Sequence, residues 1–350
     1  MTNSPRLSAL VKQYALELGF DLVGIAPAAR VPHAEAYMAW LEAGYAGNMA
    51  YMARDPMRRQ DPRLVMPETR SVIVVANSYF TGNPPAELWN DPTRGRIACY
   101  AWGRDYHEVL VHRLRQLAEF LQRHIGDEIS WRAYVDTGPL LERDLAVMAG
   151  LGFIGKNTCL IHPQWGSYLV LGELLVSVEL VYDAPITTGT CGHCTRCLDA
   201  CPTGALVAPY QLDSRKCISY LTIELRDSIP EGLRAHMGNW IFGCDVCQSV
   251  CPWTRRFAHI GQQDFLYFEP GRCVPPLLEL LVMNEAHFRT RFGHTSVKRS
   301  GWRGLMRNVA VALGNWGDRT GIPALQHAAE NSGPLIQEHI TWALHRIGGG

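Results

Sequence analysis

Apolar positions in the first 185 residues recur alternately at the spacing of helices and of strands. A helix is expected to begin at Ser4 and Pro5, a typical N-cap and a typical first-turn residue, and to end at Gly19. The other expected elements are strands over 21–26, 71–79 and 131–135, helices over 110–125 and 139–149, and one or two strands within 166–181. This alternation predicts a layered α/β domain over residues 1–185.

The remaining residues predict two further domains, so that the whole chain is a multidomain protein of the α/β and α+β classes. Residues 186–256 have few long periodic runs and contain eight of the eleven cysteines, so bound ligands are expected to organise them. Residues 257–350 have a helical pattern with an internal offset of 31 residues. Val309, Ala312, Leu313 and Gly317 recur as Ile340, Ala343, Leu344 and Gly348. This repeat predicts a HEAT-like tail, although two copies also allow a chance similarity.

Composition and charge exclude several classes of protein. With 350 residues, 47% of them hydrophobic, the chain is long enough for two or three globular domains. Its 33 basic and 33 acidic residues balance, which excludes a strongly basic nucleic-acid coat protein. Glu173 and Glu179 interrupt the most apolar stretch, and the N-terminus has no secretory signal. We therefore expect a cytoplasmic protein that does not span a membrane.

The spacing of the cysteines predicts two [4Fe-4S] clusters. The run C-x2-C-x2-C-x3-C-P from Cys191 is that of bacterial ferredoxins, in which three thiolates bind one cluster and the fourth binds another. The run C-x2-C-x3-C-P from Cys244 repeats its ending, and Cys217 is the most economical eighth ligand. The predicted ligand sets are Cys191, Cys194, Cys197 and Cys251 for cluster one, and Cys201, Cys217, Cys244 and Cys247 for cluster two.

Structural zinc is the alternative interpretation of these cysteines. Zinc also binds C-x2-C pairs, but it gives no reason for a third cysteine two residues further on, or for Cys-Pro at the end of both runs. Two neighbouring clusters carry single electrons, so a redox reaction is expected in the α/β domain.

Two segments of the α/β domain suggest a site. Asp136 follows a predicted strand and precedes a predicted helix, where open α/β sheets bind ligands, although it could equally cap that helix. Residues 150–155 match G-x-G-x-x-G, but a helix is expected before them and a strand after them, so we reject a dinucleotide site. Lys156 and Asn157 beside these glycines are candidates for an anionic or amide-bearing ligand, or for plain surface residues.

Other single residues carry less information. Asp105 and His107 begin the D-x-H-x-x-G signature of proteins that ligate cobalamin through histidine, but position 110 is leucine, so no histidine ligand is predicted. Cys99, Cys159 and Cys273 stand outside the runs and are expected to be buried and inert.

Several sequence blocks together resemble the epoxyqueuosine reductase family. The blocks run over nearly the whole length and are DPRLVMPETRSVIVVA (61–76), VDTGPLLER (135–143), GLGFIGKNT (150–158), GSYLVLGELL (166–175), CGHCTRCLDACPTGAL (191–206), CDVCQSVCPW (244–253) and RGLMRNVAVALGNWGD (303–318). The resemblance implies removal of the epoxide oxygen of epoxyqueuosine, at the wobble position of tRNAs with GUN anticodons, in the last step of queuosine biosynthesis.

The resemblance also implies cobalamin, held base-off without a histidine ligand. Single electrons from the two clusters would reduce the cobalt to Co(I), a nucleophile for an epoxide carbon. The family's proton donor falls on Asp136, whose pKa would have to be raised, for example by burial against the corrin. Family positions near the corrin fall on Arg59 and Cys99, and Lys156, Asn157 and Ser167 lie in blocks that line the same cavity in the family.

A neutral protein that binds tRNA needs local positive charge. The candidates are Arg215 and Lys216, with Lys298, Arg299, Arg303 and Arg307 expected along one face of a helix; each could also be ordinary surface charge. We expect a monomer with an electron donor that the sequence does not identify. Two alternatives remain at this stage: a reductive dehalogenase, for which the basic tail has no use, and an electron carrier, which leaves the first domain without a role.

Overall fold

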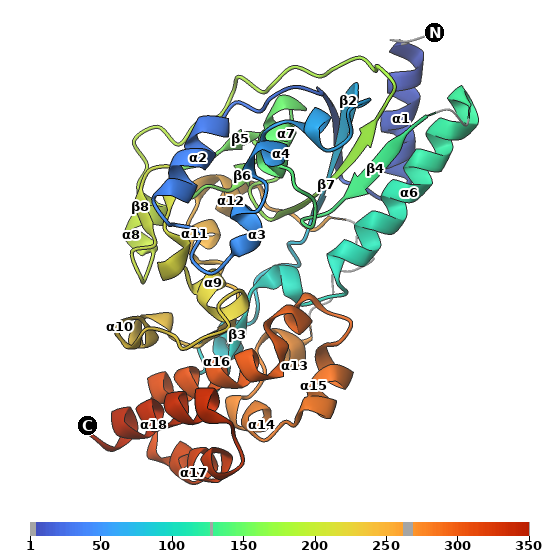
Figure 1. The fold of residues 1–350 in the computed structure, drawn as a ribbon. Coiled ribbons are helices and arrows are strands. Elements are labelled where there is room, and N and C mark those ends of the chain that lie inside the picture. The colour runs from blue at the N-terminus through green and yellow to red at the C-terminus, as the bar shows by residue number, and fades with distance from the viewer. Residues whose placement is uncertain (1–4, 127–128, 262–268, 350) are drawn as a thin grey trace.

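The computed structural model describes residues 5–126, 129–261 and 269–349 (Figure 1). Ser4, the expected N-cap of the first helix, lies outside these residues. The elements of the first half are α1 (Pro5–Glu17), β1 (Leu22–Pro27), α2 (Ala34–Glu42), α3 (Ala50–Ala53), α4 (Pro56–Gln60), β2 (Ser71–Ser78), α5 (Ala86–Trp89), β3 (Arg96–Ile97), η2 (Cys99–Ala101), α6 (Tyr106–Ile125), β4 (Trp131–Tyr134), α7 (Glu142–Met148), β5 (Phe153–Ile154), β6 (Leu160–Ile161) and β7 (Leu169–Val176).

The central sheet has the strand order β1-β2-β7-β4 and is covered by helices on both faces. Side chains of β2 alternate between the two: Ile73 and Val75 face α1 and α6, whereas Val72 and Val74 face α7. Burial on both faces explains why this strand is a continuous apolar run. The predicted layered α/β arrangement is therefore confirmed.

All pairings in this sheet are antiparallel. The rule that ligands bind beyond the carboxyl ends of parallel strands therefore does not apply to Asp136. The alternative role of Asp136 as a helix cap is also wrong, because α7 begins only at Glu142 and its N-cap is Leu141.

The cysteine-rich segment consists of short elements. They are α8 (Arg196–Ala200), β8 (Leu206–Ala208), β9 (Gln211–Leu212), α9 (Ile218–Ile223), α10 (Glu231–Arg234), β10 (Trp240–Phe242), α11 (Val246–Ser249) and α12 (Pro252–Phe257). Helix α8 follows the first cysteines and contacts α11, which lies within the second run, so the two runs lie together. Strand β10 pairs in parallel with β3, which ties this segment to the first half of the chain.

The last part of the described chain is helical. Its elements are α13 (Pro270–Cys273), α14 (Leu277–Leu281), α15 (Glu285–Phe292), η5 (Ser296–Ser300), α16 (Gly301–Trp316), α17 (Ile322–Glu330) and α18 (Pro334–Gly348). The two copies of the sequence repeat fall on α16 and α18, which pack against each other. A Cβ at Gly314 would lie 2.6 Å from the Trp342 ring, so this glycine permits the close approach. A HEAT-like unit remains a prediction.

One apolar core continues from the sheet into this helical part. It contains Leu110 and Leu114 of α6 together with Leu277, Phe292 and Leu305 of the C-terminal helices. Figure 1 shows the helices α13 to α18 gathered below the sheet, with most of the cysteine segment above them, near α2 and α3. Among the described helices, none is both long enough and apolar enough to cross a bilayer.

Candidate functional site

The four cysteines predicted for cluster one line a single cavity. Its volume is about 220 Å³, and its wall is completed by residues that include Asn157, Ile161 and Trp253. Burial and the neighbouring thiol of Cys191 raise the pKa of Cys197 to about 11. The residues that come together here are Cys191, Cys194, Cys197 and Cys251.

The four cysteines predicted for cluster two also lie close to one another. Burial raises the pKa of Cys217 and Cys244, and the charge of Cys201 acts on both in the same direction. Contact with the thiol of Cys159, then burial and the charges of Cys217 and Cys244, raise the pKa of Cys247.

Cys159 differs from the prediction that it is buried and inert. It is half-buried, and its thiol lies against that of Cys247, which lowers the pKa of Cys159. Cys99 and Cys273 are buried as expected. The sequence contains no signal for the contact of Cys159, because the two cysteines meet only through tertiary packing.

Asp136 lies on an irregular turn between β4 and α7. Its φ of 57° is in the left-handed region, which is uncommon for a residue with a side chain. Its backbone N–H donates to Glu142 Oε1 at 2.6 Å, and Tyr106 Oη donates to Asp136 Oδ2 at 3.0 Å. The Asp136 side chain is 57% exposed, so its carboxylate is accessible to a ligand.

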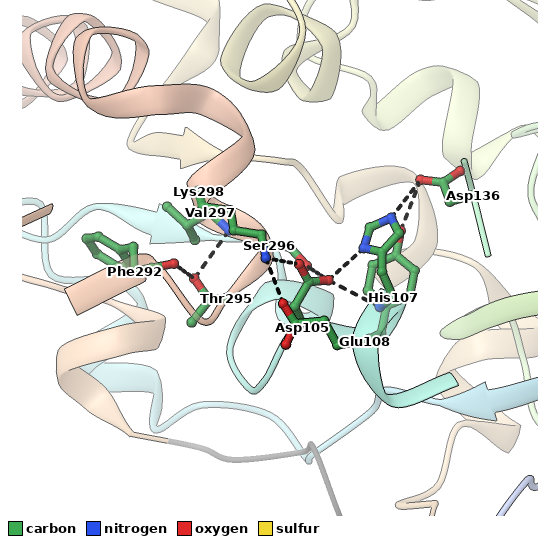
Figure 2. Close-up of polar contacts among 10 residues, drawn as sticks. Asp105, His107, Glu108, Asp136, Phe292, Thr295, Ser296, Val297 and Lys298 are labelled. Atoms are coloured by element: carbon green, nitrogen blue, oxygen red, sulfur yellow. Dashed lines mark hydrogen bonds and ion pairs between the residues drawn. The ribbon is translucent and has the colours of Figure 1, made fainter. Parts of the chain in front are cut away.

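His107 stands between two carboxylates (Figure 2). Its Nδ1 lies 2.6 Å from Asp105 Oδ1, and its Nε2 lies 3.7 Å from Asp136 Oδ2. Lys298 Nζ lies 2.8 Å from Asp105 Oδ2. Burial opposes the charge of His107, but the hydrogen bonds and charges of Asp105 and Asp136 outweigh it and raise its pKa to about 9. His107 is therefore an imidazolium at neutral pH.

The pKa of Asp136 is lowered, whereas its expected role requires a raised pKa. Desolvation alone would raise the pKa, but the hydrogen bonds and charges of His107, Tyr106 and Arg299 outweigh it. These pKa directions favour an ionised Asp136 at neutral pH, with the proton of the pair on His107.

A pair of carboxyl groups lies behind the Asp136 turn. Glu173 of β7 is fully buried, and neither of its carboxyl oxygens has a hydrogen-bond partner by distance and angle among the described residues. Burial and the charge of Asp136 raise the pKa of Glu142 to about 8, and burial and Glu142 raise that of Glu173 well above its ordinary value. Sequence reasoning missed this pair, because β7 otherwise has an apolar pattern.

The predicted cofactor contacts fall into two groups. Arg59 donates to the carbonyl oxygens of Gly138, at 3.3 Å, and Tyr51, so it holds the Asp136 turn from outside. Cys99 donates its backbone N–H to Asp245 Oδ2 at 2.8 Å.

The second group contacts the cysteine segment. Lys156 Nζ donates to the carbonyl oxygens of Gly192 and Cys194, and Asn157 Nδ2 donates to that of Cys247. Ser167 Oγ lies 2.8 Å from Thr254 Oγ1. The polar groups of Lys156, Asn157 and Ser167 thus hold the two parts of the chain together.

The basic residues do not form one row. Lys298 and Arg299 lie in η5, whereas Arg303 and Arg307 lie in α16, and the chain turns between the two elements at Gly301, whose φ is 67°. Lys298 and Arg299 are ion-paired with Asp105 and Glu224 respectively, whereas Arg303 is exposed.

Arg307 is a correction to the predicted tRNA contacts. Its side chain is fully buried and donates to the backbone carbonyls of Leu221, Leu225 and Asp227. A guanidinium in this position is not available to a phosphate. Arg215 is exposed but pairs with Asp213, and Lys216 is exposed.

Comparison with known proteins adds the family. The family described as "4Fe-4S double cluster binding domain" matches residues 190–254, and "Epoxyqueuosine reductase QueG, DUF1730" matches residues 59–137. The epoxyqueuosine reductase of Salmonella typhimurium is 43% identical over 344 residues, which cover 97% of this chain and 88% of the relative.

Two solved structures extend the likeness to the fold. An epoxyqueuosine reductase with a tRNA-Tyr epoxyqueuosine-modified stem loop has a TM-score of 0.89 and 32% identity, covering 98% of this chain and 90% of that chain. The Bacillus subtilis epoxyqueuosine reductase, with its catalytic aspartate loop swung out of the active site, has a TM-score of 0.88 and 31% identity, with the same coverage.

A double [4Fe-4S] module beside a carboxylate–imidazole site defines an iron–sulfur oxidoreductase. The zinc interpretation is thereby replaced. The chain belongs to the epoxyqueuosine reductase family, with which it shares sequence over nearly its whole length. This membership favours that enzyme over the dehalogenase and electron-carrier alternatives.

Proposed function

We propose that this protein reduces epoxyqueuosine to queuosine at the wobble position of tRNAs with GUN anticodons, as the last step of queuosine biosynthesis. The observation that carries the proposal is the exposed carboxylate of Asp136, presented by an irregular turn beside His107 and Tyr106. The relative bound to an epoxyqueuosine-modified tRNA stem loop supports a tRNA substrate for this chain.

The proposed cluster ligands are the two cysteine sets given above. For cluster one, the support is the shared cavity between α8 and α12, and for cluster two it is the mutual effect of the thiols on their pKa values. Cys159 adjoins cluster two through Cys247. The two clusters would pass single electrons from an external donor toward Asp136.

Base-off cobalamin is the proposed cofactor, and the side chains around Asp136 fit it. Both nitrogens of His107 face carboxylates, so this imidazole offers no lone pair to cobalt, which agrees with a cofactor held without a histidine ligand. When bound, reduced cobalamin supplies a cobalt-centred nucleophile for an epoxide carbon. Arg59 and Cys99 are its proposed contacts, whereas Lys156, Asn157 and Ser167 are proposed to fix the cluster segment beside it.

Asp136 is proposed to protonate the oxygen of the opening epoxide. In the Bacillus subtilis relative, a catalytic loop that is named by an aspartate is swung out of the active site, which supports this role. Because the ionised form of Asp136 is favoured at neutral pH, Asp136 must receive a proton before it acts as an acid.

The rest of the chain would bind the tRNA. We propose residues 1–185 as the catalytic domain, 186–256 as the cluster domain and 257–350 as a HEAT-like tail of a cytoplasmic monomer. Phosphate contacts are proposed for Arg215, Lys216, Lys298, Arg299 and Arg303, the predicted residues that are not fully buried.

An anaerobic single-turnover reaction tests the proposal. The iron-reconstituted protein is loaded with cobalamin, reduced with a strong chemical reductant and mixed with epoxyqueuosine-containing tRNA, and the nucleosides are analysed by mass. We expect queuosine only when cobalamin is present. Intact clusters and bound cobalamin without queuosine would contradict the proposed substrate.

A further inference from the structure

The proposed reaction consumes more protons than Asp136 holds. Removing the epoxide oxygen as water takes up two electrons and two protons. One proton goes to the alkoxide when the first C–O bond opens, and the other leaves with the oxygen as water when the second C–O bond breaks. The two electrons come from the external donor through the clusters. A single carboxyl group must therefore be reprotonated within each turnover.

We propose that His107 is the positioning residue that returns protons to Asp136, and that Asp105 and Lys298 hold it for this role. This inference rests on the proposed function. His107 Nε2 is buried and has no hydrogen-bond partner among the described residues, yet it faces Asp136 Oδ2 at 3.7 Å. That separation exceeds a hydrogen bond by only about 0.5 Å. Asp136 stands on an irregular turn, and a small shift of this turn would close the gap.

The opposite side of the ring is fixed. Asp105 is the N-cap of α6, and its Oδ1 accepts from the backbone N–H of His107 and lies 2.6 Å from the ring Nδ1. Lys298 of η5 pairs with Asp105 and Glu108, and Ser296 also donates to Asp105. The His107 ring stacks on Tyr106, with centroids 4.1 Å apart. These contacts orient Nε2 toward Asp136.

The charges around the ring favour a proton on His107 at rest. The facing groups are Asp105, Tyr106 and Glu108 at the start of α6, Lys298 of η5, and Asp136 of the turn, while Arg299 and Glu142 act on Asp136. Together they raise the pKa of His107 to about 9 and lower that of Asp136. Asp136 holds no proton at rest, so the Nε2 proton of His107 moves onto Asp136 as Asp136 passes a proton to the opening epoxide oxygen, whose alkoxide is far more basic than either group. The neutral ring keeps its Nδ1 proton, which faces Asp105, and regains its Nε2 proton through Asp136, whose exposed side meets water.

A direct titration tests this arrangement. The oxidised, cluster-containing protein carries ¹⁵N-labelled histidine, and the ring nitrogens of His107 are followed by NMR against pH. We expect the pKa of His107 near 9 in the wild type and a lower pKa in Asp105→Asn, which keeps a good helix cap. A wild-type pKa near the ordinary value of 6.5 would overturn the inference.

Turnover measurements on variants of His107 distinguish a role in returning protons from a purely structural role. In His107→Gln we expect kcat to fall about 10- to 100-fold with little change in KM, because a proton-transfer step slows. The wild-type rate should decline above pH 9 as His107 loses its proton, and Asp105→Asn should move that decline to lower pH. Free imidazole should restore part of the rate of His107→Ala. His112→Gln, an exposed histidine of the same helix, is the matched control.

The outcomes are distinguishable. An active wild type with an equally fast His107→Gln overturns the inference alone. So does a slow His107→Gln with an unchanged pH profile and no imidazole rescue in His107→Ala, because that result describes a structural contact. A wild type that makes no queuosine overturns the proposed function, and the inference with it.

Discussion

Asp136 combines an unusual backbone with a strongly interacting side chain. Its left-handed φ places the carboxylate where Tyr106 and His107 reach it, and Glu142 and Arg59 hold the backbone of the turn. A strained residue held by several contacts is typical of functional sites. We therefore expect substitutions here to change chemistry more than folding.

Replacing Asp136 with asparagine should remove the proton donor and keep the shape of the turn, since asparagine also tolerates left-handed backbone. Queuosine formation should slow about 100- to 10,000-fold, while iron and cobalamin contents stay as in the wild type. Single-turnover rates and metal analysis of the same preparations check this. Asp318→Asn, which changes an exposed capping carboxylate far along the chain, should leave the rate unchanged.

Glu173 should make stability depend on pH. Its pKa is raised in the folded protein, so between about pH 4.5 and that raised pKa only the unfolded chain loses the proton, and stability falls as the pH rises. Glu173→Gln cannot ionise. Its unfolding free energy relative to that of the wild type should therefore be about 1–3 kcal/mol more favourable at pH 8 than at pH 5, and thermal unfolding at the two pH values measures this difference. The exposed Glu119→Gln should show no such difference. Equal shifts of Glu173→Gln at both pH values would contradict the raised pKa.

The helices of the cluster segment bring distant cysteines together. Cys197 lies within α8, whereas Cys251 is the N-cap of α12, and contact between α8 and α11 closes the distance between the two runs. Ferredoxin spacing predicts both ligand sets, and the assignment of each cysteine to its cluster stays a prediction.

Cys251→Ser tests the prediction that Cys251, which lies in the second run, binds cluster one together with three cysteines of the first run. It should lose cluster one and lower the iron content from about 8 to about 4 per chain, with cluster two retained. Cys247→Ser should instead affect cluster two. Iron analysis and electron paramagnetic resonance of the reduced proteins distinguish the two variants, and Cys273→Ala is the control outside both sets. Full iron content in Cys251→Ser would show that the ligand set is wrong.

Local pattern predicted the elements better than it predicted their contacts. The expected strand 71–79 is β2 (Ser71–Ser78), and the expected helix 110–125 is the larger part of α6 (Tyr106–Ile125). The antiparallel sheet and the contact of His107 with Asp136 depend instead on which segments pack together, and periodicity carries no information about that. The sequence therefore indicated His107 only as part of an incomplete match to the D-x-H-x-x-G signature.

Among the described residues, the largest apolar core reaches from the sheet to the C-terminal helices. Because α16 packs against both β10 and α18, its basic residues have different surroundings despite their regular spacing. Arg303 reaches the surface, and Arg307 is buried among carbonyl oxygens of the cluster segment. The same helix thus contributes both to a proposed tRNA surface and to the contact between parts of the chain.

Arg303 and Arg307 should respond differently to substitution. Arg303→Gln should weaken tRNA binding and leave stability unchanged. The slope of log affinity against log salt concentration should fall by about one, because one phosphate contact is lost. Arg307→Met leaves buried carbonyl oxygens without donors, so it should lower the unfolding free energy by about 3 kcal/mol or more. Binding titrations at several salt concentrations and thermal unfolding check both variants. If Arg303→Gln binds tRNA like the wild type at every salt concentration, α16 does not contact the tRNA through this residue, and the proposed surface must lie elsewhere.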